Sequence, residues 1–164
     1  MTLPEQERER FCQVLHHSRT SLYRLAFSIT RNSSDAQEAV AEAVCRAYER
    51  YPQLREKEKL PRWLLKITAN EARRLCQRRG RTVSLDDLPT EPAIPGRETG
   101  DDTLWQAVQT LPRDQREAVV LFYYEDLPTE EIARIVGTSP GAARGRLSRA
   151  REKLRSILKE GDYG

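Results

Sequence analysis

Hydrophobic residues recur at spacings of three and four along most of the chain, and neither half shows the period-two alternation that is typical of a strand. Each such run places its apolar side chains on one face of a helix. The stripes are Leu15, Leu22, Leu25, Ala26 and Ile29; Ala36, Val40, Ala43, Val44 and Ala47; Trp63, Leu64, Ile67 and Leu75; and Leu147, Ala150, Leu154 and Ile157. The sequence therefore predicts an all-α protein.

Local signals also place the ends of the N-terminal helices. Ser34 opens a capping box, which predicts a helix over residues 35–50. Pro52 is expected to end this helix at about Tyr51, because a residue before proline avoids the helical region. Pro61 stands in the first turn of another helix, where proline is tolerated, and Gly80 ends that helix. The charged segment Pro52–Leu60 is expected to be the loop between them.

The C-terminal part of the chain carries the pattern of a helix-turn-helix motif. Thr129 is predicted to cap a helix over residues 130–136, which Gly137 ends. Ser139 then caps a final helix. Two helices joined by a short turn with a glycine are typical of this motif, whose second helix enters the major groove of DNA. The final helix is rich in basic side chains, namely Arg144, Arg146, Arg149, Arg151, Lys153 and Arg155.

A segment without helical periodicity, residues 80–100, separates the two helical parts. It contains three prolines and three glycines, which is typical of a linker. We therefore predict two small helical bundles joined by a flexible linker. The expected bounds are residues 1–80, an acidic linker over 81–103, and residues 104–164, with further helices over 103–110 and 113–124.

The charge of the chain is distributed unevenly. The net charge of the 164 residues is only +3, but basic residues outnumber acidic ones in residues 1–79 and again in 140–159, and residues 80–103 are acidic. Two separate basic surfaces are typical of a nucleic-acid binder with two contact points, although charged helix faces can also be merely solvated. The arginines of the helix-turn-helix favour DNA.

The composition excludes several classes of protein. The longest uncharged apolar run, Ala118–Tyr124, has seven residues, whereas a membrane-spanning helix needs about 20. The N-terminus has no apolar signal-peptide core, so we expect a cytoplasmic protein without membrane insertion. Since no glycine-rich phosphate loop, HExxH or GxSxG motif is present, we expect no enzymatic activity and no cofactor.

The three cysteines predict neither disulfides nor a metal site. Cys12, Cys45 and Cys76 are widely spaced and form no CxxC pair, which favours a reducing compartment. Cys12 and His16 share a helix face, but a structural zinc site takes four ligands. Cys45 and Cys76 lie beside or within apolar stripes and are expected to be buried thiols.

Two segments resemble a known family. The C-terminal part resembles region 4 of bacterial RNA polymerase sigma factors in TLPRDQREAVVLFYYEDLPTEEIARIVGTSPGAARGRLSRAREKLRSIL. The N-terminal part resembles region 2 in LYRLAFSITRNSSDAQEAVAEAVCRAYERY and PRWLLKITANEARRLCQRR. The order, the linker and the length are similar to the extracytoplasmic-function group. The resemblance implies a sigma factor that directs core RNA polymerase to promoters and helps open them, with an anti-sigma factor as a further partner.

The resemblance also implies which residues contact promoter DNA. The −35 element would be read as duplex by the final helix, through Ser139, Arg144, Gly145, Arg146, Ser148, Arg149 and Arg151. The −10 element would be held as a single strand, with an unstacked base in the loop Pro52–Leu60 and the backbone along Arg62, Trp63, Lys66, Asn70, Arg73, Arg74 and Arg78. Trp63 also lies on an apolar stripe, so core packing is an alternative role for it.

The helix over residues 35–48 resembles the surface with which members of the family dock on the β′ subunit of core polymerase. The β subunit of the same core enzyme is a further implied partner. The implied contacts are Asp35, Glu38, Val40, Glu42, Arg46 and Tyr48. The helix departs from the family pattern at four positions, where Ala39, Ala41, Ala43 and Val44 replace the usual Leu, Gln, Thr and Phe. This departure keeps an alternative open, a two-domain helix-turn-helix regulator that does not recruit polymerase. A helical adaptor that binds RNA or senses a metal is a weaker one.

The acidic residues of the linker have two interpretations. Asp86, Asp87, Glu91, Asp101 and Asp102 could mimic nucleic-acid charge in a basic channel of the polymerase, or they could simply keep a tether soluble.

Overall fold

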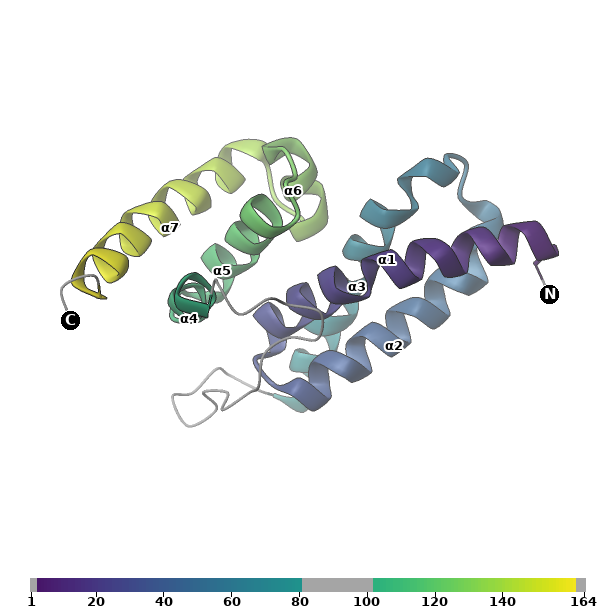
Figure 1. Ribbon diagram of the computed structural model, residues 1–164, viewed down its shortest axis with the longest axis horizontal. Helices are drawn as coiled ribbons and strands as arrows, with labels where there is room; N and C mark the ends of the chain where they lie inside the picture. The colour runs from purple at the N-terminus through teal and green to yellow at the C-terminus, as the bar shows by residue number, and fades with distance from the viewer. Residues whose placement is uncertain (1–2, 81–101, 162–164) are drawn as a thin grey trace. The chain divides into compact units, whose positions relative to one another are not determined.

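The computed structural model describes residues 3–80 and 102–161, which form helices and short turns and contain no strand. The chain divides into two compact units, Met1–Glu91 and Pro92–Gly164, which we call the N-terminal and the C-terminal unit (Figure 1). The expectation of an all-α chain with two helical units is confirmed. The predicted linker over 81–103 lies outside the described residues, except for its last two positions, which belong to a helix.

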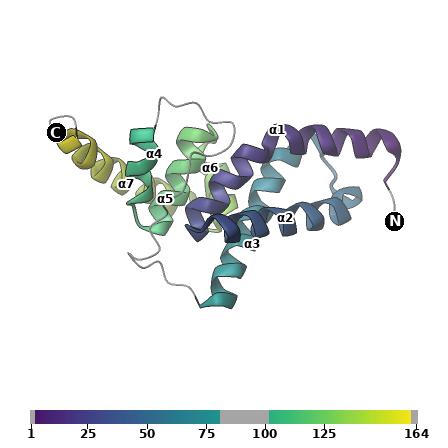
Figure 2. The same ribbon diagram turned by 60° about the horizontal axis from the view of Figure 1, so that its bottom comes forward.

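The N-terminal unit is a bundle of three long helices. These are α1 (Glu5–Thr30), α2 (Ser33–Arg50) and α3 (Leu60–Arg79), and each of them packs against the other two (Figures 1 and 2). Two short 3₁₀ turns, Tyr51–Gln53 and Lys57–Lys59, join α2 to α3. The apolar stripes predicted from the sequence supply half of the buried apolar side chains of this unit, whereas their members Leu15, Val40, Val44 and Trp63 are only half-buried.

The predicted end of α3 is confirmed, but the predicted cap of α2 is wrong. Gly80 ends α3 in the left-handed region, with φ of 62°. At the start of α2 it is Asn32 that caps the helix, because its side-chain oxygen accepts a hydrogen bond from the Asp35 N–H at 2.9 Å. Ser34 lies within the first turn, so α2 begins two residues before the predicted start.

The C-terminal unit consists of shorter helices packed on one long helix. They are α4 (Asp102–Gln109), α5 (Arg113–Val119), α6 (Thr129–Val136) and α7 (Pro140–Gly161), and α7 contacts the other three. The predicted helix over 113–124 widens at Val120 into a π-helical turn, Val120–Tyr124.

The turn between α6 and α7 has the predicted helix-turn-helix form. Gly137 ends α6 with φ of 78°, and the Ser139 hydroxyl accepts a hydrogen bond from the Ala142 N–H at 3.1 Å, as its role as N-cap requires. Thr129 is not a cap, since the extended backbone at the N-cap position belongs to Pro128 and Thr129 is the first helical residue. Of the helices in the described residues, none combines the length and the apolar character that crossing a membrane requires.

Candidate nucleic-acid and polymerase interfaces

The basic face of α7 is held outward by the apolar side chains behind it. Leu147, Ala150 and Leu154 are buried against the other helices of the unit, as their spacing predicts, whereas Ile157 of the same stripe is half-buried and Ala143, outside the predicted stripe, is buried. The residues between them stay on the surface, and Arg144, Ser148 and Arg149 are exposed. A face of this kind at the start of the second helix of a helix-turn-helix motif is where base contacts are made.

The other two arginines predicted for this face are engaged within the unit. Arg151 Nε donates to the Tyr123 hydroxyl at 3.2 Å, and its guanidinium lies over the Phe122 ring, 5.1 Å from the centroid. Arg146 Nε is 3.9 Å from Asp114 Oδ2, and the Arg146 side chain is half-buried. Gly145, the remaining predicted residue, is partly covered by an arginine of the exposed face. A Cβ on Gly145 would lie 3.2 Å from Arg149 Nη1.

The residues predicted for the −10 strand divide between two faces of α3. Arg62, Lys66 and Asn70 are exposed and repeat every four residues, and Arg73 follows on the same face. Arg73 Nη1 donates to Asn70 Oδ1 at 3.4 Å. Trp63 is half-buried, so the structure places it neither in the core nor fully in solvent.

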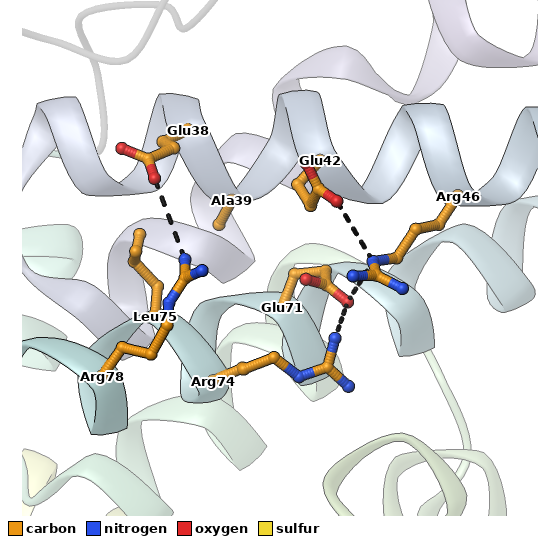
Figure 3. A pocket seen from close by; sticks show the side chains of 8 residues that line it. All are labelled: Glu38, Ala39, Glu42, Arg46, Glu71, Arg74, Leu75 and Arg78. Atoms are coloured by element: carbon orange, nitrogen blue, oxygen red, sulfur yellow. Dashed lines mark hydrogen bonds and ion pairs between the residues drawn. The ribbon is translucent and has the colours of Figure 1, made fainter.

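Arg74 and Arg78 point instead into a groove between α2 and α3. This α2–α3 groove has a volume of about 160 Å³ and is lined by Glu38, Ala39, Glu42, Arg46, Glu71, Arg74, Leu75 and Arg78. Figure 3 shows carboxylates and guanidinium groups alternating across it. At its centre Glu71 Oε2 lies 3.0 Å from Arg46 Nε and 2.7 Å from Arg74 Nη1. Arg78 is more loosely held, 3.9 Å from Glu38 Oε2.

A second set of ion pairs joins the end of α3 to the start of α2. Arg79 Nη2 is 2.8 Å from Glu38 Oε1, and Arg79 Nη1 pairs with Asp35. The side chain of Asp35 is only 2% exposed. The prediction that Asp35 contacts the polymerase is therefore corrected, because its carboxylate is enclosed by this unit.

The remaining residues predicted for polymerase contact differ in exposure. Glu38 and Glu42 lie on the outer surface of α2, whereas Val40, Arg46 and Tyr48 are half-buried. The Tyr48 ring packs edge-on against Phe11 of α1, with centroids 5.3 Å apart. The outer surface of α2 also includes Ala41, Cys45 and Glu49, at the four-residue spacing of one helix face, and none of these three was predicted as a polymerase contact.

The cysteine predictions are partly corrected. Cys76 is buried, as expected, and its Sγ lies 3.9 Å from the Ile29 carbonyl oxygen. Cys45 is exposed, because it stands one position beyond the buried side of α2. No group of three or more His, Cys, Asp or Glu side chains that could hold a metal ion occurs within residues 3–80 and 102–161.

Family models match both units. The model for sigma-70 region 2 matches residues 14–82, and the model for sigma-70 region 4 matches residues 101–154. The chain is 32% identical over 142 residues to RNA polymerase sigma factor SigV of Bacillus subtilis, a match that covers 85% of this chain and 86% of that protein. It is also 32% identical over 143 residues to the ECF RNA polymerase sigma factor EcfG of Rhodopseudomonas palustris, covering 84% and 79% of the two chains.

A solved structure gives the same result at the level of the fold. The chain is similar to the sigma factor RpoE of Bartonella quintana, which was crystallised with the anti-sigma factor NepR, with a TM-score of 0.74 and 27% identity over 91% of this chain and 96% of that one. The relatives, the two family models and the helix-turn-helix geometry agree. The chain belongs to the sigma-70 family, as an extracytoplasmic-function sigma factor that recruits RNA polymerase to promoters.

Proposed function

We propose that the exposed basic face of α7 reads the −35 element of the promoter as duplex DNA. Arg144, Ser148 and Arg149 make the base contacts, since they are the exposed members of the predicted set within α7 itself. Arginine can pair with a guanine through two hydrogen bonds. Arg146 and Arg151 are positioned by contacts within the unit, and they contribute phosphate contacts only through their exposed edges. The capped N-terminus of α7 adds Ser139 near the backbone.

The corresponding surface of the N-terminal unit is the exposed face of α3, which we assign to the separated strand of the −10 element. Arg62, Lys66, Asn70 and Arg73 follow the backbone, and Trp63 lies half-exposed beside them. Single-strand binding needs a basic track with an aromatic or apolar platform. Arg74 and Arg78 line the α2–α3 groove, where they pair with Glu71 and Glu38, and their side chains are 50% and 66% exposed, so they add positive charge beside this face.

Core polymerase docks on the outer surface of α2, through Glu38, Glu42 and the positions around them. The β′ subunit is the proposed contact for this surface, and the β subunit is a further proposed partner within the core enzyme. The protein has no catalytic activity of its own and acts in the cytoplasm, where core polymerase is. An anti-sigma factor is a further proposed partner, since the structurally similar RpoE was solved with one.

One observation carries this assignment. Each unit ends in a long helix, α3 or α7, and each of these helices has one apolar buried face and one exposed basic face. The alternative of a regulator that does not recruit polymerase has no comparable support, because both units match sigma-70 models.

The test is in vitro transcription with core polymerase on a library of promoters with randomised −35 and −10 elements. Arg149→Ala is expected to relax the preference at −35, while Arg155→Ala, an equal loss of charge farther along α7, leaves the preference in place. Arg62→Ala should weaken the use of the −10 element, with Arg19→Ala on α1 as its matched control. If the chain binds core polymerase and Arg149→Ala leaves the −35 preference intact, the assignment of α7 is wrong.

A further inference from the structure

The loop between α2 and α3 begins at a tyrosine that is enclosed on several sides. Tyr51 is fully buried, and the rings of Tyr51 and Phe11 meet edge to face with centroids 5.4 Å apart. Lys57, six residues farther along the loop, places its Nζ over the Tyr51 ring, 4.2 Å from the ring centroid. Aromatic pairs and cation–π contacts of this kind hold side chains in defined positions.

Lys57 also fixes the loop through a hydrogen bond from its side chain to the backbone of Tyr51. Its ammonium group donates to the Tyr51 carbonyl oxygen, which accepts the Leu54 N–H at 3.0 Å as well. The two 3₁₀ turns of the loop are thus tied to one carbonyl at its start. Most of the loop is exposed, including Arg55 and Glu56, so these few contacts are what holds it against the bundle.

The first turns of α1 form the support behind this arrangement. Phe11 is 2% exposed and packs against both Tyr48 and Tyr51. Glu7, one turn earlier, lies beside the Tyr51 hydroxyl, and burial together with this carboxylate raises the pKa of Tyr51 above its ordinary value. The Tyr51 ring is therefore enclosed by α1 on one side and by Lys57 on the other.

We propose that Phe11 and Lys57 are positioning residues for the −10 element: they hold the loop over residues 52–60 in the conformation that receives the unstacked base. This inference rests on the proposed use of the N-terminal unit for the −10 element and on the role that the family resemblance implies for this loop, which is to hold an unstacked base. Phe11 cannot contact DNA itself, because its side chain is only 2% exposed and packs against Tyr48 and Tyr51. A base pocket is selective only if its walls are held in place before the base enters. The contacts of Tyr51 with Phe11 on α1 and with Lys57 in the loop supply that preorganisation.

The test compares two identical substitutions on the same helix. Phe11→Leu removes the ring contact with Tyr51, whereas Phe27→Leu removes an equally buried ring that stacks on Tyr23, away from the loop. In the loop, Lys57→Met removes the ammonium group and keeps the stem, and Lys153→Met on α7 is its control, because Lys153 is exposed and lies outside the surfaces assigned to the −10 element. All four variants are made in the full chain and assayed with core polymerase on the randomised promoter library.

The readout is the discrimination among bases in the −10 element, measured as the ratio of transcripts from preferred and other templates. Phe11→Leu and Lys57→Met are expected to lower this ratio about fivefold, the equivalent of one aromatic or cation–π contact. The −35 preference should stay unchanged in both. A merely structural role would lower the transcripts of all templates together and leave the ratio as it is.

Three results separate the possible failures. If Phe11→Leu and Phe27→Leu change the −10 ratio equally, the contact with Tyr51 has no special role and the inference is wrong. If Phe11→Leu fails to fold, the comparison of Lys57→Met with Lys153→Met decides, and equal −10 ratios for those two overturn the inference. If the unaltered chain shows no −10 preference and Arg62→Ala has no effect, the proposed function of the N-terminal unit fails instead.

Discussion

Glu71 is the carboxylate at the centre of the α2–α3 groove, and we expect its charge to stabilise the N-terminal unit. Its side chain is 7% exposed and lies within 3.0 Å of Arg46 Nε and 2.7 Å of Arg74 Nη1. The substitution Glu71→Gln keeps the size and one acceptor oxygen of the side chain and removes only the charge. Two guanidinium groups then lose their most buried partner.

The expected loss lies between two known limits. Breaking a fully buried ion pair costs about 3–5 kcal/mol, whereas an exposed pair is worth about 0.2–1 kcal/mol. Here the carboxylate is buried, but the side chains of Arg46 and Arg74 are 36% and 50% exposed and can regain water. We therefore expect Glu71→Gln to lower the free energy of unfolding by about 2 kcal/mol.

The control is the same substitution at a neighbouring position. Glu42 pairs with the same Arg46, at 3.3 Å, but its side chain is 53% exposed. Glu42→Gln removes an equal charge from the groove, and we expect it to cost less than about 0.5 kcal/mol because solvent screens the pair. The two variants differ mainly in the burial of the carboxylate that is lost.

The assay is urea unfolding of the full chain, followed by tryptophan fluorescence. The chain has two tryptophans, Trp63 on α3 and Trp105 on α4, so a Trp105→Phe background reports on the N-terminal unit alone. The midpoint shift at constant slope gives the change in free energy. Equal losses for Glu71→Gln and Glu42→Gln would refute the reasoning, since burial of the carboxylate would then have no effect.

Three further predictions concern single backbone or side-chain features. Gly145→Ala should raise the stability of the C-terminal unit by about 1 kcal/mol, because alanine favours the helix and the nearest atom belongs to the flexible end of Arg149; an unchanged unfolding midpoint of the Trp105 signal would contradict this. Asp126→Gly should add about 0.5 kcal/mol in the same assay, because Asp126 has φ of 55°. The pKa of Tyr51 is raised in the folded chain, so the unfolded chain loses this proton first as the pH rises. The free energy of unfolding therefore falls above about pH 10. Tyr51→Phe should remove that fall in unfolding curves measured across alkaline pH.

Local sequence signals predicted the helices well because each signal depends on a few adjacent residues. Gly80 and Gly137 end their helices in the left-handed conformation, as expected. The cap of α2 was missed because Asn32 and the serines after it are all good capping residues, and no local rule selects among them. The π-helical turn at Val120 lies in a continuous apolar run, in which a one-residue bulge changes no pattern.

The candidate sites could be predicted only in part, because hydrogen bonds and ion pairs formed in the fold decide which basic side chains face outward. Arg151 is engaged by Tyr123, 28 residues earlier in the chain, and Arg79 by Asp35, 44 residues earlier. Arg116 would be expected on the surface from its type, yet it is 1% exposed and its Nη1 donates to the Leu111 carbonyl oxygen at 2.8 Å. A spacing pattern contains no information about such partners.

The departures of α2 from the family pattern also have a different meaning in the structure. Of the four altered positions, Ala39 and Ala43 are 1% and 0% exposed and lie inside the bundle, so they were never available to a docking partner. Their small side chains affect how closely α2 approaches its neighbours, because the distance between packed helices depends on the side chains at the contact. Only Ala41 is fully exposed, and Val44 is half-buried. The alternative that this protein does not recruit polymerase depended on all four positions, and two of them belong to the core. The charged outer residues Glu38 and Glu42, which the family pattern shares, remain on the surface that we assign to the polymerase.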